Sequence, residues 1–202
     1  MTHPLRVEAF SGERVHPLIS DLARLRITVF REFPYLYDGS LEYEQRYLRH
    51  LSRSAGSVVV GVLDGARLVG ASTGMPLADE AEGLQQPLLE GGFDLETVFY
   101  CAESVLLRPY RGRGMYRAFF AEREAHARRL GFSWSVFCAV ERPADHPRRP
   151  PGYTPLDGIW MRLGYTLRPD LRAELSWRDL DEEAETPKPM VYWLKPLEEG
   201  RG

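Results

Sequence analysis

The stretch "ESVLLRPYRGRGMYRAFFAEREAHARRLGF", residues 103–132, decides the fold. An apolar run that begins with one acid, Glu103, predicts a buried strand, and "RGRG" at 111–114 predicts a tight turn. The residues that follow predict a helix over 114–130, which Gly131 ends. A helix start carries unpaired N–H groups and a partial positive charge, so we expect this turn to bind a phosphate or a pyrophosphate.

The composition bounds the kind of protein. The chain has 202 residues, of which 44% are hydrophobic, and we expect a single domain over 1–202. With a net charge of -3 we expect no nucleic-acid partner. Cys101 and Cys138 lie in apolar runs without disulfide or zinc spacing, so no metal is expected. The absence of a signal peptide and of a long apolar segment predicts a cytoplasmic protein that does not bind a membrane. We expect a monomer or a homodimer.

Strands and helices alternate irregularly along the chain. The apolar patterns predict strands over 5–10, 98–107, 133–140, 174–180 and 189–197, and a hairpin over 57–76 around Asp64 and Gly65. They predict helices from Pro17, from Leu41, over 114–130 and over 156–164, while 78–96 and the proline-rich 143–155 are expected to be loops. The expected class is α/β, a mixed and mainly antiparallel sheet with helices on both faces.

Three phosphate-binding turns can be compared with residues 111–116. A P-loop needs Gly-Lys-Ser/Thr, which is missing, and a dinucleotide fingerprint needs a third glycine where this chain has Arg117. The turn resembles the acyl-CoA signature of the GNAT superfamily of N-acetyltransferases, Gln/Arg-x-x-Gly-x-Gly/Ala. The upstream order also resembles that family, with an acid, an apolar strand and then a proline shortly before Arg-Gly-x-Gly. Tyr116 departs from it, because the family has Gly or Ala at this position.

The resemblance implies an acetyl-CoA site. In that family, amides of the turn hold the CoA pyrophosphate, the strand edge pairs with the pantetheine arm, and the Val105 N–H lies near the thioester oxygen. The cofactor-binding residues implied here are Val105, Leu106, Leu107, Arg111, Gly112, Arg113, Gly114, Met115, Tyr116 and Trp160. The long proline loop before Trp160 resembles, more weakly, the GNAT modules that are fused to carbon–nitrogen hydrolase domains.

Glu103 is the candidate general base. Strand alternation predicts that it shares one face with Phe99, Cys101, Val105 and Leu107. A carboxylate among apolar neighbours is costly to bury as a charge, and such an acid is suited to taking a proton from an amine. The family often carries its base here. The alternatives are an ion pair with a nearby arginine, or a bulge that turns Glu103 to solvent.

The proton donor to the CoA thiolate stays open. Many family members use a tyrosine four residues before the glycine that closes the last helix, and this chain has Trp160 there. An indole does not donate such a proton, which leaves Tyr153 or water.

On the acceptor side, Tyr35 and Tyr37 lie near acids such as Glu44, a combination that suits a cationic amine. The leading hypothesis is therefore an N-acetyltransferase that moves an acetyl or short acyl group from acyl-CoA to a primary amine of a small molecule or peptide. The alternatives are a non-catalytic acyl-CoA sensor or partner module on the same fold and, more distantly, a nucleotide-binding domain.

Overall fold

A computed structural model describes residues 4–197 and contains one seven-stranded sheet. The strands are β1 (Arg6–Phe10), β2 (Val58–Asp64), β3 (Arg67–Pro76), β4 (Val98–Leu106), β5 (Trp134–Val140), β6 (Thr166–Trp177) and β7 (Thr186–Pro196). Their order is β1-β2-β3-β4-β5-β7-β6, and every neighbouring pair is antiparallel except β4 with β5. The predicted mixed, mainly antiparallel α/β class is confirmed.

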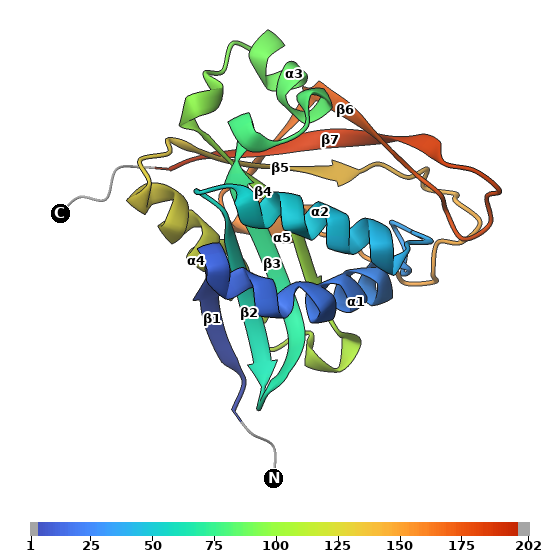
Figure 1. Cartoon of the computed structure of the whole chain (residues 1–202). Helices are drawn as coiled ribbons and strands as arrows, with labels where there is room; N and C mark the ends of the chain where they lie inside the picture. Colours follow the sequence, from blue (N-terminus) through green and yellow to red (C-terminus); the bar gives the residue numbers. More distant parts are fainter. Residues whose placement is uncertain (1–3, 198–202) are drawn as a thin grey trace.

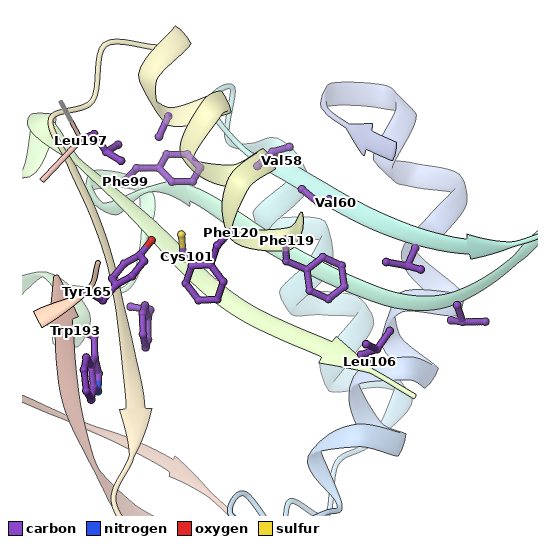
Figure 2. Close-up of a cluster of buried hydrophobic side chains, with 14 residues drawn as sticks. Val58, Val60, Phe99, Cys101, Leu106, Phe119, Phe120, Tyr165, Trp193 and Leu197 are labelled. Carbon is purple, nitrogen blue, oxygen red and sulfur yellow. The ribbon is translucent and has the colours of Figure 1, made fainter. Parts of the chain in front are cut away.

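Helices cover both faces of the sheet. They are α1 (Ile19–Phe30), α2 (Leu41–Arg53), α3 (Glu82–Glu90), α4 (Met115–Arg129) and α5 (Asp157–Arg162). Helices α1 and α2 lie side by side against one face (Figure 1), where they pack on Val59 and Ala71. Helix α4 packs on the other face, where Phe119 and Phe120 lie among β-strand side chains such as Val58 (Figure 2).

The sheet splits between β4 and β5. These two strands pair only over Val98 to Tyr100 and Trp134 to Val136, and no further pairing joins them among the described residues. In Figure 1, β1 to β4 lie roughly along one axis, whereas β5, β7 and β6 lie across it. The end of β4 that carries Glu103 therefore has β3 on one side and an open gap on the other.

A β-bulge in β4 changes which face its side chains occupy. Thr73 pairs with Glu103 but Met75 pairs with Tyr100, so β4 carries one extra residue at this point. Cys101 consequently packs in the α4 cluster, whereas Val105 packs in the α1 and α2 cluster. The predicted shared face of Phe99, Cys101, Glu103, Val105 and Leu107 is wrong, because alternation assumes a regular strand.

Other predicted elements agree in kind. The hairpin around Asp64 and Gly65, the helix after the Gly-Arg turn and the short helix before Gly164 are confirmed. The predicted loop over 78–96 contains α3, which sequence reasoning missed because Gly83 and Pro87 are unfavourable inside a helix. Burial of Leu84 and Leu88 against the sheet stabilises α3 instead. Within residues 4–197, no helix has the length and apolarity needed to cross a membrane.

Candidate active site

The Gly-Arg turn forms the start of α4. Gly112 and Gly114 adopt φ values of 75° and 80°, and Gly114 is the N-cap residue. An L side chain is strained in this left-handed region, which explains the two glycines. The turn directs the first N–H groups of the 15-residue helix, from Met115 onward, away from the helix body. An anion such as a pyrophosphate fits such a set of donors.

The arginine side chains of the turn play unequal parts. Arg111 forms two hydrogen bonds of 2.9 and 3.0 Å to the Glu32 carboxylate, and its Nε donates to the Leu106 carbonyl at 2.9 Å. Arg113 lies over the Tyr110 ring, at 5.6 Å from its centroid, and is exposed. Arg111 thus holds the turn against β4 and against the segment that follows α1. Of the two arginines, Arg113 has the side chain whose charge is available to a ligand.

The hydrogen-bond register determines which amides of β4 face the gap. The Leu107 N–H donates to the Val69 carbonyl at 3.0 Å, so residues 105 and 107 direct their backbone groups to β3. The amides of Ser104 and Leu106 point the other way, toward the β5 side. The sheet ladder therefore uses the predicted Val105 and Leu107 amides, while Ser104 and Leu106 form the free strand edge.

A cavity of about 320 Å³ occupies the gap between β4 and β5. Its walls include Glu103 and Ser104 from β4, and Tyr116 and Arg123 from α4. Trp160 of α5 also lines it, and its indole Nε1 donates a hydrogen bond of 2.9 Å to the Tyr116 hydroxyl. Side chains thus leave open space along the β4 edge, of a size that admits a narrow extended chain.

Three tyrosines line this cleft, namely Tyr35, Tyr116 and Tyr153. Burial raises the pKa of Tyr116, and the hydrogen bond from Trp160 acts in the opposite direction because it stabilises the phenolate. Burial also raises the pKa of Tyr153, whose ring packs edge-on against Phe33 at 4.7 Å. Tyr116 occupies the position at which the acyl-CoA signature has Gly or Ala. Its hydroxyl accepts the hydrogen bond from Trp160, which occupies the position of the tyrosine that many GNAT proteins have.

Glu103 is buried and ion-paired. Its side chain is 4% exposed, and its Oε2 lies 2.5 Å from the Arg26 guanidinium. Arg26 also bonds the buried Glu44 and stacks over the Tyr47 ring at 4.6 Å. Of the two structural alternatives to a catalytic role for Glu103, the ion pair is present and the turn to solvent is not. Glu103 Oε1 has no hydrogen-bond partner within residues 4–197 and remains available as an acceptor.

Arg123 stabilises the bulge in β4. Its guanidinium donates hydrogen bonds of 3.2 and 2.8 Å to the carbonyls of Thr73 and Glu103, which flank the point where the ladder is interrupted. The side chain is 1% exposed and lies over the Phe120 ring at 4.6 Å. Arg123 therefore fixes the backbone of Glu103, while Arg26 fixes its carboxylate.

A second cavity, of about 580 Å³, opens on the α1 and α2 side of Glu103. Tyr35 and Glu103 line both cavities, and Tyr37 lines the second. The second cavity has five acids and two basic side chains in its walls, namely Glu44, Asp79, Glu80, Glu103 and Glu185 with Arg26 and His50. The structure thus brings the predicted Tyr35 and Tyr37 to a cavity that is acidic and aromatic.

Buried contacts fix the positions of Tyr35 and Tyr37. Burial raises the pKa of Tyr35, and burial together with Glu44 raises the pKa of Tyr37. Arg142 donates to the carbonyls of Pro34 and Tyr35 at 2.8 and 2.9 Å, which ties their loop to the β5 edge. Both phenols stay neutral and polar in the cavity wall.

Sequence reasoning missed four of these residues. Ser104 was identifiable only from the strand register, and Arg26, Arg123 and Glu80 lie on elements whose contacts are long-range. Leu22 and Leu25 form part of the buried face of α1, but nothing local marked Arg26 as part of it. Among residues 4–197, no cluster of three or more His, Cys, Asp or Glu side chains could hold a metal ion.

Comparison with known proteins shows the fold. No family model and no curated protein sequence matches the chain. Among solved structures, an acetyltransferase of the GNAT family from Streptococcus pneumoniae aligns with a TM-score of 0.59 and 9% identity, over 96% of this chain and 99% of that one. A ribosomal-protein-alanine N-acetyltransferase from Brucella melitensis aligns with a TM-score of 0.62 and 12% identity, over 95% and 99%.

A third similar structure carries a ligand. A Salmonella typhimurium protein assigned as an acetyltransferase was solved with its cofactor acetyl-CoA, and it aligns with a TM-score of 0.60 and 10% identity over 99% of this chain and 98% of that one. The chain described here therefore has the GNAT acetyltransferase fold over nearly its whole length.

Proposed function

We propose that this protein, which has the GNAT fold, transfers an acetyl or short acyl group from acyl-CoA directly to an amine. The observation that carries the proposal is the place of Glu103, a buried carboxylate in the walls of both cavities. One cavity follows a free strand edge beside a helix start, and the other has an acidic and aromatic wall.

The chain's own groups fit acyl-CoA. The positive-φ glycines 112 and 114 present helix-start amides to a pyrophosphate, and Arg113 adds an exposed charge. The Ser104 and Leu106 amides are directed to the cleft, where they suit the amides of a pantetheine arm. Acyl-CoA supplies an activated acyl group as a thioester. We assign the donor for the developing oxyanion to Ser104 in place of Val105, because the Val105 amide belongs to the β3 ladder.

Glu103 accepts a proton from the attacking amine. Its Oε2 is held by Arg26, so Oε1 is the atom that receives the N–H of an amine entering from the second cavity. Arg123 holds the backbone carbonyl of Glu103, and Arg26 holds its carboxylate. Tyr116, with its hydroxyl oriented by Trp160, is the group we assign to protonate the departing thiolate.

Glu103→Gln tests this function. We expect kcat/KM for amine acetylation to fall by roughly 10²–10⁴-fold, while the calorimetric Kd for CoA stays unchanged. Glu122→Gln, an exposed change on α4, serves as the control. Because Arg26 loses a charged partner in Glu103→Gln, circular dichroism must first establish that the variant is folded.

The second candidate function is a non-catalytic acyl-CoA sensor, which the pairing of Glu103 with Arg26 favours, since that pair also serves the fold. A protein that binds CoA tightly and acetylates no amine in a library of primary amines would have this function instead.

A further inference from the structure

The second cavity has a carboxylate that its own protein leaves uncompensated. Glu80 lines this cavity, and its Oε1 is buried with no hydrogen-bond partner within residues 4–197. Its Oε2 accepts only the Ala81 N–H, at 3.2 Å, among the side-chain and backbone donors of the described chain. Glu80 forms no ion pair there either. Burial raises the pKa of Glu80, which agrees with a carboxyl group that lacks a cation.

Glu103 differs from Glu80 in this respect. Glu103 pairs with Arg26, which also pairs with Glu44, and the side chain of Glu103 is nine-tenths buried. Its Oε1 nevertheless lacks a donor. The second cavity therefore contains two carboxylate oxygens without a hydrogen-bond donor. Glu103 lies where this cavity meets the cleft, and Glu80 lies outside the cleft.

Buried acceptors without donors are costly, and a ligand that supplies N–H groups to both removes that cost. A neutral amine at Glu103 needs only an acceptor, which Oε1 provides. Glu80 forms no ion pair among residues 4–197, so a cationic group of a ligand can supply the missing partner. The aromatic side chains of the wall, with Tyr37 among them, add favourable faces for a cation.

We propose that the acceptor is an amine with a second cationic group, a diamine or polyamine in class, whose distal ammonium binds Glu80 while its reacting amine lies at Glu103. This inference rests on the proposed function and names the substrate class of that same site.

Three primary amines with five-carbon chains test the assignment, because they differ in the charge at the far end. Cadaverine carries a second ammonium, pentylamine a methyl group and aminopentanoate a carboxylate. We expect kcat/KM to follow that order. In Glu80→Gln, the preference for cadaverine over pentylamine should fall by about 10-fold or more. In Glu82→Gln, an exposed change two residues away, the preference should be unchanged.

Calorimetric titration of each compound in the presence of CoA gives a readout that does not depend on turnover. If amines are acetylated but Glu80→Gln leaves the cadaverine preference intact, or aminopentanoate is the best acceptor, the diamine assignment is overturned and the proposed function stands. If none of the three compounds is acetylated, the acetyltransferase proposal is contradicted for this class. The Kd of cadaverine then decides the assignment, because Glu80 binding still predicts about 10-fold weaker affinity in Glu80→Gln.

Discussion

Arg26 is the residue whose loss should damage the site most. Its side chain is 11% exposed and lies between the carboxylates of Glu44 and Glu103, whose side chains are 1% and 4% exposed. It also stacks over the rings of Tyr47 and Phe30, at 4.6 and 5.2 Å. In Arg26→Met, the packing volume is largely kept but two buried carboxylates lose their cation.

The expected cost follows from that burial. Breaking a buried ion pair by removing one partner costs about 3–5 kcal/mol. For a chain of this size, 1 kcal/mol corresponds to roughly 2–4 °C in Tm, so Tm should fall by roughly 6–20 °C. Arg24→Met is the matched control on the same helix. Its ion pair with Asp21 joins side chains that are 65% and 62% exposed, so its loss should cost less than about 1 kcal/mol.

A combined variant separates charge from packing. In Arg26→Met with Glu44→Gln and Glu103→Gln, the two carboxylates that lost their cation are neutral amides, and we expect most of the lost Tm to return. Thermal unfolding followed by circular dichroism measures all three proteins. The reasoning is refuted if Arg26→Met and Arg24→Met have equal Tm values, or if the combined variant is no more stable than Arg26→Met alone.

Two further changes test the cofactor turn and the proton donor. Gly114→Ala places an L side chain at a φ of 80°, so it should cost about 1–2 kcal/mol in unfolding free energy. It should also weaken CoA binding measured by calorimetry. The control Gly83→Ala, inside α3, should cost nothing, and equal effects of the two changes would contradict the left-handed requirement at Gly114. Tyr116→Phe should lower kcat by roughly 10-fold, which is less than the usual range for acid–base catalysis, because a thiolate leaves readily. Tyr153→Phe should leave kcat unchanged. The reverse result would assign the role of the acid to Tyr153.

The sequence determined the local features of this protein. Glycines at 112 and 114 required a left-handed turn at a helix start, and Asp64 with Gly65 required a hairpin. Apolar periodicity found most helices and strands, because a face that packs on a sheet repeats at short intervals. The acid in β4 and the turn after it were therefore identifiable as a candidate site before any contact was known.

The tertiary structure alone decided which groups contact one another in that site. A bulge in β4 between Cys101 and Glu103 interrupts the alternation of side chains that the sequence pattern assumes. The register with β3 left the Ser104 amide, not the Val105 amide, facing the cleft. Arg26 reached Glu103 from another element of the chain. Register, bulges and buried ion pairs depend on which distant segments come together, and periodicity carries no information about that choice, because it describes one segment at a time.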